Sequence, residues 1–275
     1  MLKRAVSGAV YVAIIVGALL GGGLWTCALA VMFCMLAALE FDDLVEERHS
    51  YEKIVGITDI VGTLCLTVGI SGYGLLLWLL VLLVRMIEEL YLRESDPLYN
   101  LALSVFAQIY LGLPCGILFG VGVVDYFGEM YYSLPTKEIL HVTLAIFVLI
   151  WLNDTGAYLV GSWLGKHKMI ERISPKKTWE GFAGGVIFCV GGATACYWIM
   201  PMGYYPVLWS WIGLGVVVAL FSTWGDLVES LFKRDIGVKD SGNLIPGHGG
   251  ILDRIDSFLL VMPASLVYLF ATWLL

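Results

Sequence analysis

The sequence predicts an all-α membrane protein that crosses the bilayer many times. Of its 275 residues, 59% are hydrophobic and only 14% are charged, whereas soluble domains contain about 25% charged residues. The mean hydropathy of +0.86 agrees with this class. Long apolar runs recur along the chain, and the basic residues gather between alternate runs. Both patterns are typical of a polytopic membrane protein.

Nine apolar runs approach the length of a membrane-spanning helix, which takes roughly 17 to 25 residues. They cover residues 5–22, 24–40, 54–71, 73–90, 99–123, 139–164, 181–200, 205–224 and 255–275. We expect Arg85, Glu88 and Glu89 to end the fourth helix at the membrane interface, and Asp59 to reach the interface from the third. The acidic segment 40–53 is expected to be a solvated connector rather than a metal site.

The basic residues predict the orientation of these helices. With nine spans, fifteen of the sixteen Lys and Arg residues lie in connections on the N-terminal side, and only Lys137 lies on the other. Lys and Arg accumulate in cytoplasmic connections. We therefore expect the N-terminus in the cytoplasm and the C-terminus outside.

The stretch 222–256 is unusually polar for its place between two apolar runs. It contains six carboxylates, four cations and a Gly-His-Gly-Gly turn. One face of a helix is predicted by the spacing of Asp226, Glu229, Ser230, Lys233 and Arg234. Six Gly and Pro residues between positions 235 and 250 then predict a loop. Asp253 and Asp256 follow one helical turn apart, at the start of the last apolar run.

This pattern suits phosphate chemistry at a membrane surface. Carboxylates can bind Mg²⁺, while cations and glycine-rich backbone amides can bind phosphate. The alternative is a solvated loop with incidental ion pairs. The density and spacing of the charges favour the site.

Two further segments carry polar groups that we expect on the same side of the membrane as the stretch 222–256. Asn153 and Asp154 lie about midway along the run 139–164, where a charge costs at least about 2.5–3.5 kcal/mol, so we expect Asp154 to be functional or neutralised. Residues 165–180 then contain five Lys and Arg residues. This cluster suits either a phosphate-rich ligand or the anionic lipid surface.

Together these features predict Mg²⁺-dependent phosphoryl or nucleotidyl transfer onto a lipid. The nucleotide would enter from the cytoplasm and the lipid from the bilayer. A CTP-dependent polyprenol or phytol kinase is an alternative enzyme, although an alcohol acceptor would need a general base. A membrane transporter is an alternative of another class, but most of the charges gather at one face rather than at the bilayer midplane.

Three motifs carry a family resemblance. The first begins with SLFKR at Ser230, continues through KDSG at Lys239 and PGHGG at Pro246, and ends with DRID at Asp256. The others are NDTGAY from Asn153 and SPKKTWEG from Ser174. The chain resembles the phosphatidate cytidylyltransferases, or CDP-diacylglycerol synthases. The resemblance implies the reaction of CTP with phosphatidic acid to give CDP-diacylglycerol and pyrophosphate, by in-line transfer.

The resemblance and the residue pattern together assign roles. A metal centre, occupied by Mg²⁺ with a second ion left open, is expected on Asp226, Asp253 and Asp256, and Asp154 is added from its depth in the membrane. Catalytic roles are expected for Asp226, Lys233, Arg234, Lys239, Asp240, His248 and Arg254. Substrate binding is expected for Asn153, Ser174, Lys176, Lys177, Thr178, Glu229 and Ser230. His248 would either contact phosphate or only shape the turn.

The chain is expected to divide into two regions. Residues 1–138 would form about five N-terminal spans, and residues 139–275 a catalytic transmembrane region with cytoplasmic loops 165–180 and 225–254. The expected location is the inner, cytoplasmic membrane of a bacterium, with the active site facing the cytoplasm. The expected partners are CTP, phosphatidic acid and the lipid bilayer, with no nucleic acid. A homodimer is left open.

Overall fold

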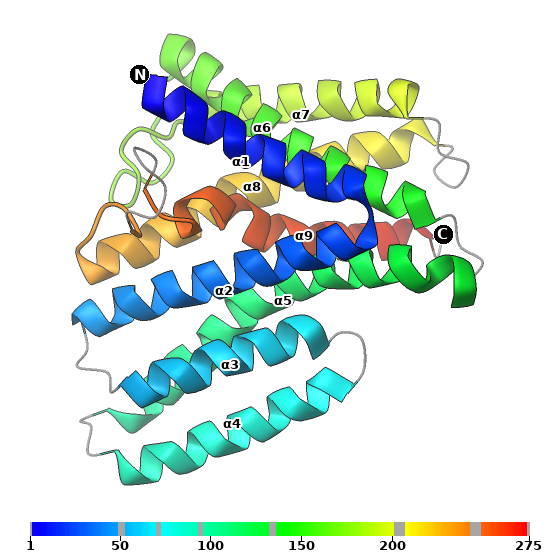
Figure 1. Cartoon of the computed structure of the whole chain (residues 1–275). Helices are drawn as coiled ribbons and strands as arrows, with labels where there is room; N and C mark the ends of the chain where they lie inside the picture. The colour runs from blue at the N-terminus through cyan, green and yellow to red at the C-terminus, as the bar shows by residue number, and fades with distance from the viewer. Residues whose placement is uncertain are drawn as a thin grey trace. The chain divides into compact units, whose positions relative to one another are not determined.

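The structure is a computed structural model. It describes residues 2–48, 53–69, 73–92, 96–131, 136–200, 207–242 and 249–273. Nine helices form within these ranges (Figure 1). They are α1 (Leu2–Gly21), α2 (Gly23–Arg48), α3 (Lys53–Gly69), α4 (Tyr73–Tyr91), α5 (Pro97–Tyr131), α6 (Thr136–Leu164), α7 (Trp179–Ile199), α8 (Leu208–Ile236) and α9 (Leu252–Trp273).

The predicted all-α membrane class is confirmed, but nine spans are not. Six helices in the described ranges, α2 and α5 to α9, are long and apolar enough to cross a membrane. The apolar parts of α1 and α3, Val6–Gly21 and Gly56–Gly69, are shorter. Helix α4 carries Arg85, Glu88 and Glu89 within its 19 residues. The count of nine spans and the orientation of the termini therefore stay predictions.

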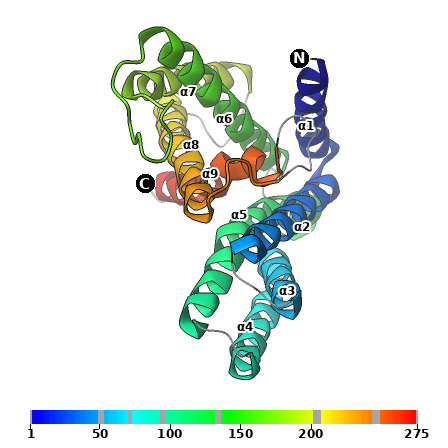
Figure 2. The same ribbon diagram turned by 90° about the vertical axis from the view of Figure 1, so that its left-hand side faces the viewer.

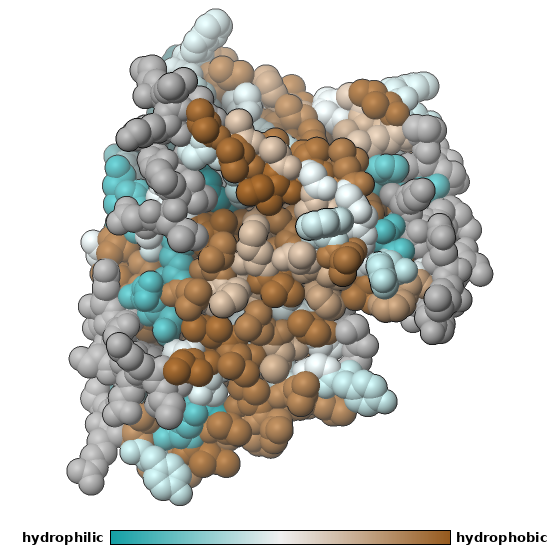
Figure 3. All heavy atoms as spheres, in the orientation of Figure 1, coloured by the Kyte–Doolittle hydropathy of each residue, from teal (hydrophilic) through white to brown (hydrophobic). Residues whose placement is uncertain are grey.

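Apolar side chains remain on the outside of the protein, as expected for contact with lipid. Hydrophobic residues cover broad areas of the face shown in Figure 3. In α4, for example, Leu76, Leu80 and Leu83 are all more than half exposed. A soluble domain rarely exposes apolar area on this scale, whereas hydrocarbon tails cover it at no cost.

Residues 1–136 and 240–255 form one compact unit. In it α2 packs along α5, α3 packs against α2, α4 and α5, and α1 packs against α2. A buried polar network joins α3, α4 and α5. Arg85 is 1% exposed, its Nη1 lies 2.6 Å from Oε2 of Glu89, and its Nε donates to Ser104. Asp59 accepts hydrogen bonds from Ser104 and Gln108.

This network shows that Arg85 and Asp59 are not isolated exposed charges, because they lie 3.9 Å apart with side chains only 1% and 15% exposed. Residues 41–48 of the expected connector are helical rather than a loop. Helix α2 continues to Arg48, and Glu40 itself is buried.

Residues 137–239 and 256–275 form the second unit. It contains nearly all of α6, the whole of α7 and α8, and most of α9, and these helices group together in Figure 2. Helix α7 packs along α8. Helix α8 continues from the apolar run through the charged residues without a break and ends at Gly237, which has a φ of 88°. The amide of Gly237 donates to the carbonyl of Lys233, and Lys233 and Arg234 occupy the last turn.

Candidate active site

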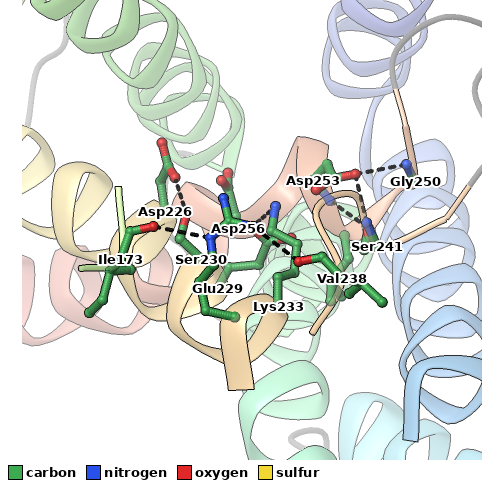
Figure 4. A network of polar contacts seen from close by, with 12 residues as sticks. Ile173, Asp226, Glu229, Ser230, Lys233, Val238, Ser241, Gly250, Asp253 and Asp256 are labelled. Carbon is green, nitrogen blue, oxygen red and sulfur yellow. Dashed lines mark hydrogen bonds and ion pairs between the residues drawn. The ribbon is translucent and has the colours of Figure 1, made fainter. Parts of the chain in front are cut away.

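Three carboxylates from two helices meet in the second unit. Asp226 and Glu229 lie one turn apart on α8, and Asp256 lies in the second turn of α9. One oxygen atom from each lies within 4.8 Å of the others. Figure 4 shows these side chains beside one another. Such a group is costly without cations, because its like charges repel.

A close crossing of α8 and α9 brings the carboxylates together. Gly225 precedes Asp226, and a Cβ atom at Gly225 would lie 2.7 Å from the carbonyl oxygen of Asp256 and 3.0 Å from Cα of Ser257. The hydroxyl of Ser257 also donates to the carbonyl of Ser222 at 3.1 Å. The absence of a side chain at Gly225 therefore lets the two helix backbones approach where the acidic residues lie.

Two lysines neutralise part of this charge. Nζ of Lys177 lies 2.7 Å from Oδ2 of Asp226, and Nζ of Lys233 lies 2.6 Å from Oε2 of Glu229. The Lys233 pair is the more buried, with side chains only 12% and 1% exposed. The site thus holds carboxylates and ammonium groups together, as a site for both metal and phosphate requires.

The segment that carries Lys177 is held by its own hydrogen bonds. The amide of Met169 donates to the carbonyl of Lys177 at 3.0 Å, and the amide of Lys177 donates to the carbonyl of Ser174 at 3.2 Å. Thr178 then begins α7 as an N-cap, because its side chain accepts a hydrogen bond from the amide of Gly181. Ser174 and Thr178 therefore shape the segment that presents Lys177.

Glu180 fixes the other end of this segment. Its carboxylate accepts hydrogen bonds from the backbone amides of Lys166 and His167, and its Oε1 lies 2.5 Å from Nδ1 of His167. Lys176 is exposed beside this segment. The expected cationic loop is thus an ordered connection rather than a flexible tether.

The polar residues in α6 have different surroundings. Asn153 is only 2% exposed, and its amide donates to the hydroxyls of Ser222 and Thr223 on α8. Its Oδ1 lies against Gly185 on α7, where any Cβ would overlap it. Asp154 is exposed and lies near enough to Asp256 to interact with it electrostatically. Asn153 therefore joins three helices, while Asp154 adds negative charge beside the carboxylates.

Arg234 and Lys239 lie in and just after the last turn of α8, and Arg254 lies in the first turn of α9. Arg234 donates to the carbonyls of Ile173 and Val238 at 3.3 Å and 3.1 Å. Ser230 donates to Oδ1 of Asp226 at 3.2 Å, as drawn in Figure 4. Lys239, Asp240 and Arg254 are exposed. His248 lies outside the residues that the structure describes.

Asp253 makes contacts of its own in the first unit. Its Oδ2 accepts hydrogen bonds from the backbone amides of Ser241 and Gly250 at 3.1 Å and 3.0 Å (Figure 4). Gly249 beside it has a φ of 81°, a conformation that favours glycine. Asp253 thus holds the residues before α9 in place. The group of three carboxylates in the described residues contains Glu229 where the sequence analysis placed Asp253.

Glu229 is expected from the sequence to bind substrate, and the structure places its carboxylate beside those of Asp226 and Asp256. Asp226 and Glu229 are three positions apart on one helix face, a spacing that also suits two ligands of one metal. The sequence could not reveal that Asp256, rather than Asp253, completes the group with them, because both lie in the first turns of the same helix.

The donor set fits a hard divalent cation. All three groups are carboxylates, and oxygen ligands of this kind are those that Mg²⁺ prefers. Together they provide negative charge from two separate helices. Lys177 and Lys233 neutralise part of this charge by pairing with Asp226 and Glu229. Asp226, Glu229 and Asp256 are accordingly the residues that would hold such an ion.

Comparison with known proteins identifies the family. Residues 2–272 match the model of the Cytidylyltransferase family, which is nearly the whole chain. The chain belongs to the cytidylyltransferase family.

Curated relatives of this cytidylyltransferase carry a more specific name. A phosphatidate cytidylyltransferase of Staphylococcus aureus (strain COL) is 46% identical over 142 residues, which are 50% of this chain and 52% of that protein. The Staphylococcus saprophyticus protein of that name has the same identity and coverage. The Staphylococcus epidermidis protein is 44% identical over 145 residues, covering 53% of this chain and 55% of its own. The chain spans about half the length of the curated relatives it matches.

Proposed function

We propose that this cytidylyltransferase makes CDP-diacylglycerol and pyrophosphate from CTP and phosphatidic acid. The observation that carries the proposal is the group of Asp226, Glu229 and Asp256 with Lys177 and Lys233 paired to it. It combines metal ligands and phosphate-binding cations at one place in a membrane protein. The family and the names of the relatives support the same reaction.

The chemical step is an in-line displacement at phosphorus. An oxygen of the phosphatidate phosphate forms a bond to the α-phosphorus of CTP, and the bond from that phosphorus to the oxygen bridging the α- and β-phosphates breaks. Pyrophosphate leaves with the electron pair. The attacking phosphate is already an anion at neutral pH, so the enzyme needs positioning and charge neutralisation more than a general base.

The side chains divide this work. Asp226, Glu229 and Asp256 would hold Mg²⁺, which when bound supplies positive charge to the phosphates of CTP. Lys177 and Lys233 would exchange their carboxylate partners for phosphate oxygens. Further cations for the two substrates would come from Lys176, Arg234, Lys239 and Arg254, all exposed at the surface of their segments.

Supporting roles fall to the other predicted residues. Ser230 orients Asp226 through its hydrogen bond, and Ser174 and Thr178 hold the segment of Lys177. Asn153 keeps α6 against α8 behind the carboxylates, and Asp154 sets the charge near Asp256. Asp253 shapes the start of α9, and the motif implies catalytic roles for Asp240 and His248. A second ion, if bound, would draw on Asp253 or Asp154.

The site is proposed to face the cytoplasm in a bacterial inner membrane, with nine spans, the N-terminus inside and the C-terminus outside. The distribution of Lys and Arg supports this orientation. Single cysteines placed at Lys239 and Lys137 in a cysteine-free variant would test it. A membrane-impermeant thiol reagent added to intact cells should label the second position only.

A direct assay tests the reaction. The purified protein in detergent or lipid, given CTP, Mg²⁺ and phosphatidic acid, should release CDP-diacylglycerol and pyrophosphate in equal amounts. EDTA should stop the reaction and added Mg²⁺ should restore it. A CTP-dependent kinase would instead release CDP. Failure to form CDP-diacylglycerol by protein that elutes as a folded species would refute the proposal.

A further inference from the structure

Glu40 on α2 makes contacts that the proposed reaction does not explain. Its side chain is 8% exposed, and its carboxylate accepts hydrogen bonds from a segment more than 200 residues away. The donors are the hydroxyl of Ser241 and the backbone amides of Ile251 and Leu252, the amides at 2.6 Å and 3.2 Å. All four residues belong to the first unit.

These contacts place a negative charge at the start of α9. The first amides of a helix have no carbonyl partner within the helix, and the helix dipole favours an anion there. Leu252 is the first residue of α9 and Ile251 precedes it. Glu40 therefore supplies the capping carboxylate that a nearby Ser or Asp usually provides.

Gly242 and Gly250 both leave room for this carboxylate. A Cβ atom at Gly250 would overlap the Glu40 carboxylate, and one at Gly242 would lie 2.7 Å from it. The hydroxyl of Ser241 contacts Glu40 and also accepts a hydrogen bond from the amide of Asp253 at 3.3 Å. Glu40 thus fixes the residues on both sides of the predicted Gly-rich turn.

We propose that Glu40 is a positioning residue for the metal-binding carboxylates. Asp256 follows Leu252 by four residues on α9, so the direction of its side chain depends on where that helix begins. Glu40 fixes that beginning through two backbone amides. Neutralising Glu40 would allow the first turn of α9 to fray and Asp256 to lose its defined orientation. The inference rests on the proposed function, since it assigns Asp256 to the metal.

The test compares Glu40→Gln with Asp43→Asn in the full-length protein. Both remove one negative charge from α2, but Asp43 is exposed, whereas Glu40→Gln keeps the buried volume and weakens the cap. We expect Glu40→Gln to raise the Mg²⁺ concentration for half-maximal activity by about 10- to 100-fold, as loss of groups that orient metal ligands commonly does. The KM for CTP at saturating Mg²⁺ should change far less. Asp43→Asn should behave as the wild type.

Direct binding of Mn²⁺, followed by electron paramagnetic resonance without substrates, should show the same loss. If Glu40 served folding alone, Glu40→Gln would lower the fraction of active protein but leave the metal concentration at half-saturation unchanged. That result would overturn the inference. Ser241→Ala removes one hydrogen-bond partner of Glu40 and should also raise the Mg²⁺ concentration for half-maximal activity. This second variant tests the inference even if Glu40→Gln folds poorly. A wild-type protein that binds Mn²⁺ but makes no CDP-diacylglycerol would count against the proposed function instead.

Discussion

Nζ of Lys177 lies 2.7 Å from Oδ2 of Asp226, so a side chain expected to hold phosphate is paired with one expected to hold metal. The ion pair neutralises Asp226 while no substrate is present. Binding of metal and triphosphate would then require Lys177 to change partner. On the proposed roles, the pair would couple the two binding events through one short contact.

The first prediction concerns this coupling. Lys177→Met should tighten Mn²⁺ binding in the absence of nucleotide, because it removes a competing cation. The pair is partly exposed, so the gain should be at most about 1 kcal/mol, or roughly fivefold in Kd. Turnover should nevertheless fall by roughly 100-fold, since the phosphates lose a positive partner. Lys168→Met removes the same charge from the same segment and should leave Mn²⁺ binding unchanged. Weaker Mn²⁺ binding by Lys177→Met would contradict the competition.

The second prediction concerns the metal ligands. Asp226→Asn and Asp256→Asn should each reduce turnover by at least about 100-fold without loss of folded protein, because each removes an anionic ligand. The assay is formation of CDP-diacylglycerol, with monodisperse elution in detergent as the measure of folding. Asp235→Asn, at the exposed end of α8, is the matched control. Substantial activity in either ligand variant would exclude the assigned role.

The third prediction concerns the helix crossing. Gly225→Ala would place a methyl group against the backbone of Asp256 and Ser257, which cannot move without separating α8 from α9. We expect a loss of about 1–3 kcal/mol in stability and a larger fractional loss of activity. Gly191→Ala on α7 is the control, since a Cβ there has no neighbour within 4 Å. Thermal unfolding and activity of the two variants should differ clearly, and equal behaviour would mean that the crossing does not set the site.

The fourth prediction concerns the buried network of the first unit. Arg85→Met removes the cation beside Asp59 and Glu89, and an uncompensated buried charge costs roughly 3–5 kcal/mol. We expect a large fall in the thermal unfolding temperature. The substitution Leu83→Met, on the exposed part of α4, should leave it nearly unchanged. A stable Arg85→Met protein would show that the network contributes little to folding.

Local patterns predicted the parts of the fold that depend on local sequence. Apolar runs located the starts of all nine described helices to within three residues, because burial in lipid requires such runs. The ends of α2, α5 and α8 lie 8, 8 and 12 residues beyond the predicted ends. The spacing from Asp226 to Arg234 correctly predicted a helix. It did not predict that this helix is continuous with the preceding apolar run, since charged residues usually mark the end of a span.

The remaining features depend on contacts between distant residues. Arg85 was expected at the interface because its neutralisation by Asp59 on another helix leaves no mark in the local sequence. Glu40 was assigned to a solvated connector for the same reason, as its partners Ile251 and Leu252 lie far along the chain. Substrate binding by Asn153 stays a prediction, and nothing in its local sequence indicates that its amide donates to Ser222 on another helix. Polar groups in apolar segments can thus serve packing as well as chemistry.

An anomalous difference map from crystals grown with Mn²⁺ and CTP tests the central claim most directly. We expect a metal peak within about 2–2.5 Å of carboxylate oxygens of Asp226, Glu229 and Asp256, close to the phosphates of CTP. The ammonium of Lys177 should have moved from Asp226 to a phosphate oxygen. A metal peak away from these carboxylates, or CTP bound with the three side chains far apart, would contradict the account.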